Sequence, residues 1–518
     1  MTIPDPVFEW LELSPVLVVF VAACLGVIIE AVVPRKARFY CQLVLAEISL
    51  LSSVGFLVFN GVRGAWGPLA MKAVMLDGPA FVAWLALLVF GFLALLVFAE
   101  RKINAGATAF AALASAVPGS ATESEAIAQR REHTEIFPLA LFSIAGMMVF
   151  VAANDLLTMF IALEVMSLPL YLMSGMARSR RILSQEAALK YFLLGAFASA
   201  FFLFGIALLY GYSGSFNLAR IADSLGFSTM NRGLLLCGIG LMAVGLLFKA
   251  GVVPFQFWVP DVYTGAPTPV TGFMAICTKL AAVVGLARVF YVALGAERWS
   301  WQTLFAVLAI ATMLVGVILA LTQTDLKRLL AYSAISHAGF ILTAVVGAYQ
   351  NVAAGRVNAF GSIIFYLIAY GFGIIAAFAI ITTVRDEGGE ATRLQSWNGL
   401  GRKNPLLAGV FAFLLLSFAG IPLTGGFIGK WEVFASAWAG GFWWLAITAV
   451  GFSLVAAYVY IKVIMAMFFE EPDETVVVGK ASLFTWIPVA IGALATLYLG
   501  IFPEHLMELV SNLQIFLR

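Results

Sequence analysis

Residues 234–260 read LLLCGIGLMAVGLLFKAGVVPFQFWVP, and this segment is the clearest indication of the fold class. It is apolar, and it is longer than the roughly 20 residues that a membrane-spanning helix needs. Pro254 lies inside it, and a proline within a helix removes a backbone hydrogen bond and clashes with the preceding turn. The stretch therefore predicts a membrane helix that is broken near mid-membrane, with Lys249 directly before the break.

A second stretch has the same character. Residues 406–438 are too long for one straight span, and Pro422 lies among glycines within them. The segment AGVVP at 250–254 is echoed by AGIP at 419–422. Interrupted helices at corresponding places in two halves of a chain indicate an inverted repeat around a central ion path. Two ordinary proline kinks in packed helices are the alternative.

The composition is that of a polytopic membrane protein. Of the 518 residues, 62% are hydrophobic and 11% are charged, and no soluble domain of this length has such a balance. A search for apolar spans predicts about fourteen transmembrane helices. The net charge of +2 and the scattered cysteines give no sign of a nucleic-acid partner or of a zinc site.

Charged loops predict the orientation. With this segmentation, the loops on the side opposite the termini carry 17 Lys and Arg residues, and the terminal side carries 7. Cytoplasmic loops of membrane proteins carry the excess of Lys and Arg. We therefore expect a multi-pass protein of the bacterial plasma membrane with both termini on the non-cytoplasmic side.

Six cations lie inside the predicted spans. Each costs about 2.5–3.5 kcal/mol at the centre of a membrane helix, so together they require a compensating reason, such as a polar pathway for ions or protons. Two of them lie near helix ends and are expected to snorkel to the interface; these are Arg288 and Lys462. The other four are Lys190, Lys249, Lys279 and Lys430.

Lys249 and Glu164 are the strongest candidates for a switchable pair. Both are predicted at mid-span, and a helix break admits water beside the lysine. Burial and a nearby carboxylate change the proton affinity of a lysine in opposite directions, so a lysine held between them can take up and release a proton. A static buried ion pair that fixes the helix register is the alternative.

Three further residues extend the predicted relay. Lys279 lies midway along the next helix and Lys430 follows the second break, with snorkelling or structural pairing as the alternatives. His337 carries a group suited to proton shuttling, although a lone helix histidine is often a hydrogen-bonded core residue.

Other charged residues in the spans are less clearly placed. Lys190 either pairs with Glu186, four residues before it, or lies beside the Glu164/Lys249 site. Glu30 and Glu47 lie in the first two helices and are candidates for packing or for contacts with other subunits.

Three segments resemble the antiporter-like membrane subunits of proton-pumping NADH–quinone oxidoreductase, the respiratory complex I. They are FKAGVVPFQFWVPDVYTGAPTPV at 248–270, DLKRLLAYS at 325–333 and GIPLTGGFIGK at 420–430. The PDVY and GAPT elements look like the branch called subunit N, whereas the sister branches L and M usually show a histidine-containing variant. This family often has a histidine where the present chain has Gln256.

The resemblance implies an all-α polytopic membrane fold of about fourteen helices with two inverted five-helix repeats and two broken helices. It also implies that Glu164 and Lys249 form the pair that drives pumping, that Lys279 is the central relay and that Lys430 lies towards the exit. The expected units are three N-terminal helices over 1–100, repeats over 135–293 and 301–468, and a C-terminal helix and tail over 482–518. The segment over 101–134 is rich in Ala, Ser, Glu and Gly, and this composition predicts a partly disordered cytoplasmic loop.

Redox chemistry is expected in other subunits. The sequence has no dinucleotide fingerprint and no cysteine framework for a cluster, so NAD, FMN, iron–sulfur clusters and quinone are expected elsewhere in the complex. Expected partners are the neighbouring antiporter-like subunit, small membrane subunits and the lipid bilayer. The alternatives are a subunit of a multisubunit cation/proton antiporter or of a membrane-bound hydrogenase, a non-pumping scaffold, and a stand-alone solute transporter.

Overall fold

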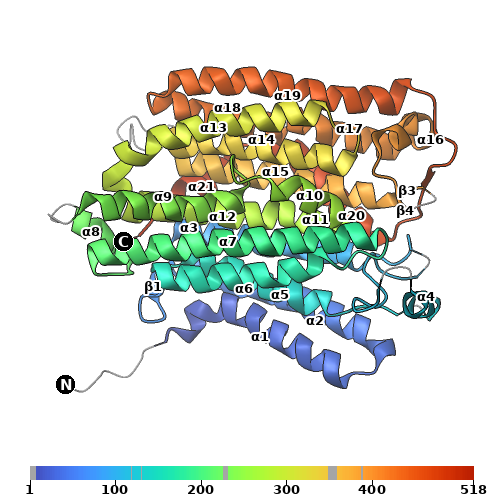
Figure 1. Cartoon of the computed structure of the whole chain (residues 1–518), viewed down its shortest axis with the longest axis horizontal. Coiled ribbons are helices and arrows are strands. Elements are labelled where there is room, and N and C mark those ends of the chain that lie inside the picture. Colours follow the sequence, from blue (N-terminus) through green and yellow to red (C-terminus); the bar gives the residue numbers. More distant parts are fainter. Residues whose placement is uncertain are drawn as a thin grey trace.

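The protein is a bundle of long, nearly aligned helices (Figure 1). The computed structural model describes residues 8–104, 106–117, 120–129, 131–225, 231–347, 359–386 and 389–517. In these ranges, 12 helices are long and apolar enough to cross a membrane. Two shorter apolar helices, α5 (Ile136–Ala152) and α17 (Pro405–Ala419), complete the predicted set of crossings. The prediction of an all-α polytopic membrane fold is confirmed.

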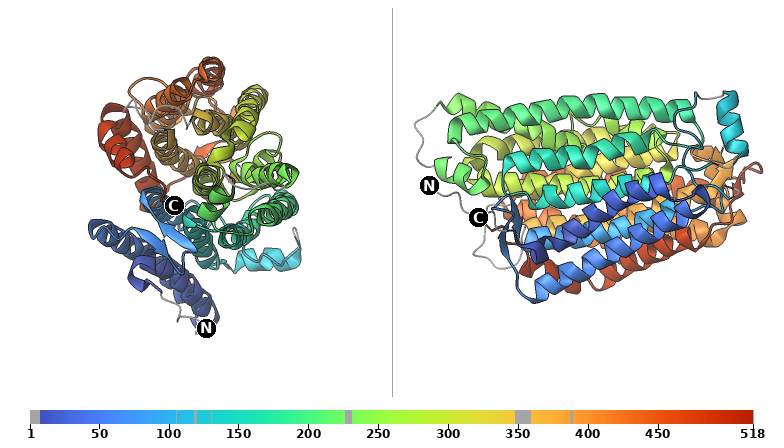
Figure 2. Two further views of the ribbon diagram at one scale, coloured as in Figure 1. Left: turned by 90° about the vertical axis from the view of Figure 1, so that its left-hand side faces the viewer. Right: turned by 90° about the horizontal axis from the view of Figure 1, so that it is seen from below.

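The chain starts with a layer of helices at the edge of the bundle (Figure 2). A short antiparallel hairpin separates the second helix from the third. These elements are α1 (Trp10–Val32), α2 (Arg35–Val62), β1 (Gly67–Leu69), β2 (Val74–Leu76) and α3 (Gly78–Phe98).

The next part of the chain contains the first broken helix, formed by α9 and α10. It comprises α5, α6 (Leu156–Ser174), α7 (Arg181–Ser213), α8 (Leu218–Leu225), α9 (Arg232–Ala250), α10 (Trp258–Gly265), α11 (Thr268–Phe273), the π-helical turn η1 (Met274–Thr278), α12 (Lys279–Arg288) and a second π-helical turn, η2 (Val289–Ala293).

The remaining part contains the second broken helix, formed by α17 and α18. It comprises η3 (Gly295–Glu297), α13 (Arg298–Leu321), α14 (Leu326–Gly347), α15 (Ala359–Thr383), β3 (Val384–Asp386), β4 (Gly389–Glu390), η5 (Leu394–Trp397), α16 (Leu400–Lys403), α17, α18 (Gly425–Ala439), α19 (Trp443–Phe469), β5 (Val477–Val478), α20 (Leu483–Ile501) and α21 (Glu504–Asn512).

Both predicted breaks are present, and a glycine ends the first half of each broken helix. The backbone φ is +75° at Gly251, directly after α9, and +84° at Gly420, directly after α17. Glycine adopts this left-handed conformation without the steric cost that a Cβ atom brings. The chain then resumes as α10 and α18, so each break leaves helix ends inside the bundle.

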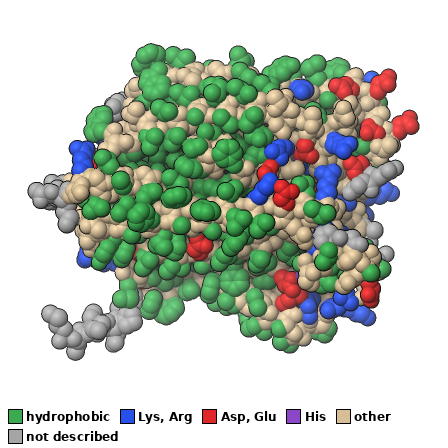
Figure 3. Space-filling model, in the orientation of Figure 1, with side chains coloured by type: hydrophobic (Ala, Val, Ile, Leu, Met, Phe, Trp, Pro, Cys, Tyr) green, Lys and Arg blue, Asp and Glu red, His purple; other side chains and the backbone are tan. Residues whose placement is uncertain are grey.

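The interior consists of α14, α15 and the run from α11 to η2. These segments are almost completely buried, whereas α1, α2, α7, α13 and α19 expose apolar side chains. Figure 3 shows hydrophobic side chains over the middle of one face and charged side chains towards the ends of the bundle. This apolar band is the surface expected to face lipid tails.

Residues between 101 and 134 were predicted to be partly disordered, and those that the structure describes are packed. They include the short helix α4 (Ala121–Ala128), capped by the Ser120 hydroxyl. Phe110 is fully buried, and Arg181 donates to the carbonyl of Ala114 at 2.9 Å. A buried aromatic ring and a buried guanidinium hold this segment against the end of the bundle.

Arg288 was predicted to snorkel, and this prediction is wrong. Its guanidinium is buried and binds both carboxylate oxygens of Asp77, at 2.9 and 2.7 Å, while Nε donates to the carbonyl of Val151 at 2.6 Å. Bidentate pairing satisfies the charge inside the protein, so the side chain has no need to reach water.

Glu100, which follows α3, holds the N-terminal end of α20. Its carboxylate accepts hydrogen bonds from the Ser482 amide at 2.8 Å, the Ser482 hydroxyl at 2.6 Å and the Thr485 hydroxyl at 2.8 Å, and from the Lys102 amide at 2.7 Å. Burial raises the pKa of Glu100, but these hydrogen bonds outweigh burial and hold the pKa below its usual value. The carboxylate also lies at the N-terminus of α20, where the helix dipole favours negative charge.

We expect Glu100→Gln to lower the free energy of unfolding by about 1–2 kcal/mol at pH 7, because charged hydrogen bonds are replaced by weaker neutral ones. A carboxyl with a lowered folded-state pKa contributes fully above its unfolded-state pKa and loses that contribution as the pH falls through the folded-state pKa. The difference between the two proteins should therefore vanish in acid. Thermal unfolding in detergent across this pH range measures it, and a difference that persists in acid contradicts the assignment.

Candidate functional site

Lys249 is buried at the C-terminal end of α9, only 3% exposed. Its Nζ donates to the Ser167 hydroxyl at 2.7 Å and to the Tyr171 hydroxyl at 3.2 Å, both in α6. The aromatic rings of Tyr171 and Tyr191 also face the ammonium, at 5.1 and 5.4 Å from Nζ. A helix C-terminus, hydroxyl oxygens and aromatic faces all stabilise a cation, so the site can hold the charged lysine.

Glu164 lies in α6, the helix that supplies both hydroxyl partners of Lys249. Within the part of the chain that the structure describes, no ion pair joins Glu164 to Lys249, and one carboxylate oxygen of Glu164 is buried without a hydrogen-bond partner. Ser167 follows Glu164 by three residues and Tyr171 by seven, so all three share one side of α6. The two hydroxyls take the place next to the ammonium that the sequence assigned to Glu164.

Lys279 follows the π-helical turn η1 and is 4% exposed. Its Nζ donates to the Ala334 carbonyl in α14 and faces the Tyr370 ring at 5.4 Å from the centroid. π-Turns inside helices are frequent at functional sites because they change the direction of the following side chain.

A small cavity connects the first two lysines. Lys249 and Lys279 both line it, together with Tyr263 and Ala334. Its volume is about 10 Å³, which is close to the space that one water molecule requires. The predicted neighbours in the relay therefore border the same small cavity.

His337 lies one turn after Ala334 on α14 and is buried. Its Nδ1 is 2.5 Å from the Tyr366 hydroxyl, and its Nε2 is 3.1 Å from the Tyr460 hydroxyl. The imidazole also lies 4.7 Å from the Tyr370 ring, which faces Lys279. Both ring nitrogens thus have phenol partners, an arrangement in which a proton can enter at one nitrogen and leave at the other.

Lys430 ends this row of buried cations. Its Nζ lies 5.1 Å from the centroid of the Phe340 ring on α14. It donates to the Ala419 carbonyl at the end of α17 and to the Ser453 hydroxyl, both at 2.9 Å. The second helix break therefore supplies a free backbone acceptor for the lysine, as broken membrane helices do for cations.

One side of α14 sets the order of the groups. Lys279 contacts Ala334, His337 follows three residues later, and Lys430 contacts Phe340 three residues after that. At 1.5 Å per residue these contacts span about 9 Å along the helix. A second cavity of about 10 Å³ lies beside His337, between Tyr366, Tyr370 and the start of α18.

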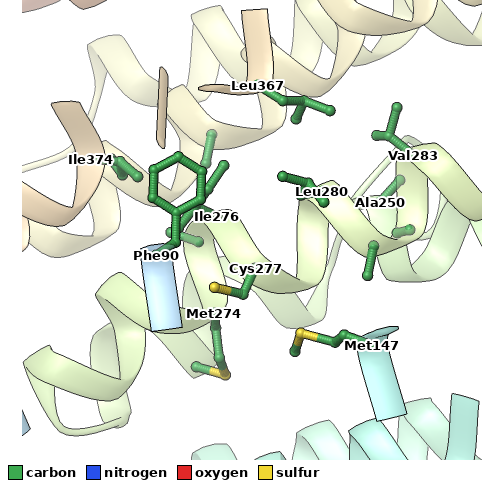
Figure 4. Packing of buried hydrophobic residues seen from close by; sticks show 14 of the residues in the cluster. Phe90, Met147, Ala250, Met274, Ile276, Cys277, Leu280, Val283, Leu367 and Ile374 are labelled. Carbon is green, nitrogen blue, oxygen red and sulfur yellow. The ribbon is translucent and has the colours of Figure 1, made fainter. Parts of the chain in front are cut away.

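Apolar packing insulates this polar row. Figure 4 shows Ile276, Cys277, Leu280 and Val283 around the helical turns that carry Lys279, with Met147 packed nearby. These side chains are nearly or fully buried. Apolar surroundings that exclude water strengthen electrostatic interactions along the row, because the local dielectric constant is low.

Lys190 lies outside the buried row. It forms the predicted pair with Glu186 at 2.7 Å and a second pair with Asp261 at 2.8 Å, and Asp261 also binds Arg328 at 2.8 Å. This cluster lies on the surface and joins α7, α10 and α14; charged side chains of both signs gather over α10 in Figure 3. These ion pairs hold α10, the half-helix that follows the first break, against α7 and α14.

Stacked rings connect this surface cluster to the buried lysine. Trp258 in α10 stacks on Tyr191, with centroids 4.6 Å apart and planes at 8°, and Tyr191 packs edge-on against Tyr171 at 4.7 Å. Trp258 also donates to the Phe248 carbonyl, next to Lys249, at 2.9 Å. A shift of α10 would therefore move the groups that hold Lys249.

Sequence reasoning missed the hydroxyl groups of the site. They are Ser167, Tyr171, Tyr366, Tyr460 and Ser453. Ser167 and Tyr171 lie three and seven residues after Glu164, and this helical spacing indicates that they share its side of α6. The others come from distant helices, and the chain carries 14 tyrosines that spacing alone does not sort.

Two broken helices and a row of buried lysines define an antiporter-like membrane protein. A family model described as the transmembrane domain of NADH:quinone oxidoreductase and Mrp antiporters matches residues 153–456. The chain is 50% identical to NADH-quinone oxidoreductase subunit N of Nocardioides sp. (strain ATCC BAA-499 / JS614), with 99% of each chain covered. It is 49% identical to the subunit N of Rhodococcus opacus (strain B4), with 100% of this chain and 98% of that protein covered. The chain belongs to the NADH-quinone oxidoreductase subunit N family.

Solved structures support the same assignment. A chain of respiratory complex I from Thermus thermophilus with bound aureothin superposes with a TM-score of 0.75 at 31% identity, covering 95% of this chain and 98% of that one. A chain of the Mrp complex from Dietzia sp. DQ12-45-1b gives a TM-score of 0.78 at 22% identity, covering 97% of each chain. The second similarity shows that the fold is shared beyond complex I.

Proposed function

We propose that this chain is a proton-translocating membrane subunit of NADH–quinone oxidoreductase and conducts protons along the buried row described above. The observation that carries the proposal is the continuous order of polar groups from Lys249, through one shared cavity, to Lys279, His337 and Lys430. Each of these four groups can gain and lose a proton, and apolar packing surrounds them. NADH oxidation and quinone reduction take place in other subunits, and this chain couples to them.

The first step is a change at Glu164. A conformational or electrostatic signal from a neighbouring subunit alters the distance between its carboxylate and Lys249. Ser167, three residues after Glu164 on α6, accepts a hydrogen bond from Lys249 and donates its own hydrogen to the Leu163 carbonyl, so it holds the ammonium beside the helix that carries Glu164. When the carboxylate moves away, the ammonium loses electrostatic stabilisation and releases its proton into the cavity shared with Lys279.

The next steps follow α14. Lys279 takes up the proton, and the ring of Tyr370 lies beside both this lysine and His337. His337 accepts a proton at one ring nitrogen and gives one up at the other, towards Lys430 and the second helix break. Release from Lys430 past Ser453 restores the starting state.

The energy released or consumed when a buried charge pair separates is similar to the energy needed to move a proton across the membrane. Moving one charge against the membrane potential costs about 2.3 kcal/mol per 100 mV. Two unit charges 4 Å apart interact with about 4 kcal/mol at an effective dielectric constant of 20. Separating one pair in the buried site therefore supplies energy of the required order.

The proposal includes the orientation of the chain in the membrane and its partner subunits. The termini face the non-cytoplasmic side of a bacterial plasma membrane, and the partners are a neighbouring antiporter-like subunit and small membrane subunits. The fourth membrane helix after α3 and the fourth from α13 onwards are the broken ones, which supports two inverted five-helix repeats over 135–293 and 301–468. The N-terminal helices, the 101–134 segment and the 482–518 tail lie outside them.

The Lys249→Ala variant of the assembled complex tests this function. We expect about a tenfold loss of NADH-driven proton transport into membrane vesicles, because Ser167 and Tyr171 remain but no group next to them can carry the charge. Subunit content after purification should match that of the unchanged complex. Full proton transport in a correctly assembled Lys249→Ala complex would instead support a scaffold role.

A further inference from the structure

A basic cleft of about 380 Å³ lies at the end of the bundle opposite the termini. The α1–α2 turn forms one wall, and the residues that precede α5 form the other. Its charged lining consists of the cations Arg35, Lys36, Arg38, Arg101 and Arg131 and the acids Glu30, Glu132 and Glu135. The volume lies within the range of pockets that bind small ligands.

Each acid of this cleft is already occupied by a partner. Glu30 also accepts a 2.6 Å hydrogen bond from the Thr134 hydroxyl. The His133 ring bridges two groups: its Nε2 accepts from the Ala114 amide at 2.8 Å, and its Nδ1 lies 2.6 Å from a Glu135 carboxylate oxygen. Two acids pair with arginines, Glu30 with Arg38 at 2.7 Å and Glu132 with Arg101 at 2.8 Å, whereas Glu135 has only the His133 ring as its partner.

Three cations are left over. Within the described ranges of the chain, Arg35, Lys36 and Arg131 form no ion pair with a carboxylate. Arg131 is oriented by Gln129, whose side-chain oxygen accepts from its Nε at 2.9 Å. Three unpaired cations against the single carboxylate of Glu135 leave this cleft with an excess of positive charge, which indicates an anionic ligand.

The position of the cleft indicates which anion. The helices that lead to it present apolar side chains outward, with Ile28 56%, Val32 75% and Tyr40 60% exposed. An exposed tyrosine at a helix end is typical of the boundary between lipid tails and headgroups. Lys and Arg side chains gather at this end of the bundle in Figure 3.

We propose that this cleft binds the phosphate headgroup of an anionic phospholipid. Arg35 and Lys36 at the start of α2 would contact the phosphate from one side, and Arg131 would contact it from the other. Basic pockets between transmembrane helices recognise such headgroups through the same charge pattern. The lipid would tie the α1–α2 turn to the segment before α5 and would do so independently of proton transport.

The test compares binding of a photo-crosslinkable phosphatidylglycerol with that of the matching phosphatidylcholine, using the full chain in its purified complex. We expect the Arg35→Gln/Lys36→Gln/Arg131→Gln variant to bind phosphatidylglycerol about 100-fold more weakly, since each cation near a headgroup contributes roughly a factor of five. The charge-retaining variant Arg35→Lys/Lys36→Arg/Arg131→Lys should bind nearly as well as the unchanged chain. Its binding also shows that substitution at these positions permits folding.

A matched control removes three exposed cations at the other end of the bundle, in Arg63→Gln/Lys72→Gln/Arg220→Gln. It should leave crosslinking to the cleft unchanged. Equal losses in both triple variants, or equal labelling by phosphatidylcholine, would overturn the proposal. So would inorganic phosphate that displaces the lipid at millimolar concentration, because the site would then recognise a free anion.

Discussion

Replacing Lys279 with methionine is expected to lower NADH-driven proton transport of the assembled complex by about 100-fold. Methionine fills similar space but cannot take up a proton. Lys279 lies between the cavity that it shares with Lys249 and the Tyr370 ring that packs against His337. An uncompensated charge at the centre of a membrane helix costs about 2.5–3.5 kcal/mol, and that cost adds to the barrier for every proton.

The Lys279→Arg variant distinguishes a proton-relay role of this residue from the role of a permanent structural charge. Arginine keeps the positive charge but does not release its proton in proteins. A relay should therefore fail with arginine as it fails with methionine, whereas a purely structural cation should tolerate the change. Proton uptake measured with a pH indicator in vesicles reports both variants, and Lys462→Met, on the exposed side of α19, serves as the control that keeps activity.

Much of the fold follows from local sequence. Apolar length alone gives the crossings, and proline among glycines marks the breaks at 251–257 and 420–424. These features are readable because each depends on neighbouring residues only. The same holds for the position of Lys249 at the end of a half-helix.

The detailed site is less readable because it depends on geometry between distant helices. The turn before Lys279 is π-helical, and no composition rule distinguishes such a turn from an ordinary apolar helix. The distance between Glu164 and Lys249 depends on how α6 rotates against α9, which hydrophobic periodicity specifies only coarsely. Ion pairs between residues far apart in the sequence are equally hard to predict, since Lys190 pairs with Asp261, which lies 71 positions later.

The pair of Asp77 and Arg288 shows the same limit and carries the largest expected effect on stability. The two residues are 211 positions apart and are almost completely buried, at 0% and 1% side-chain exposure. Asp77 also caps α3 through the Ala80 amide at 2.9 Å and accepts from the Leu517 amide at 3.2 Å. One ion pair thus connects α3, α12 and the C-terminal tail.

Arg288→Met is expected to lower the free energy of unfolding by about 3–5 kcal/mol, because it leaves the carboxylate of Asp77 buried without its partner. The double variant Asp77→Asn/Arg288→Met should recover part of this loss, since no buried charge is then unpaired. Unfolding in detergent, followed by circular dichroism, measures both, with the exposed Arg220→Met as the control that changes little. If the double variant is less stable than Arg288→Met by the full cost of the Asp77 change, the two residues act independently and the pair is not what holds these elements together.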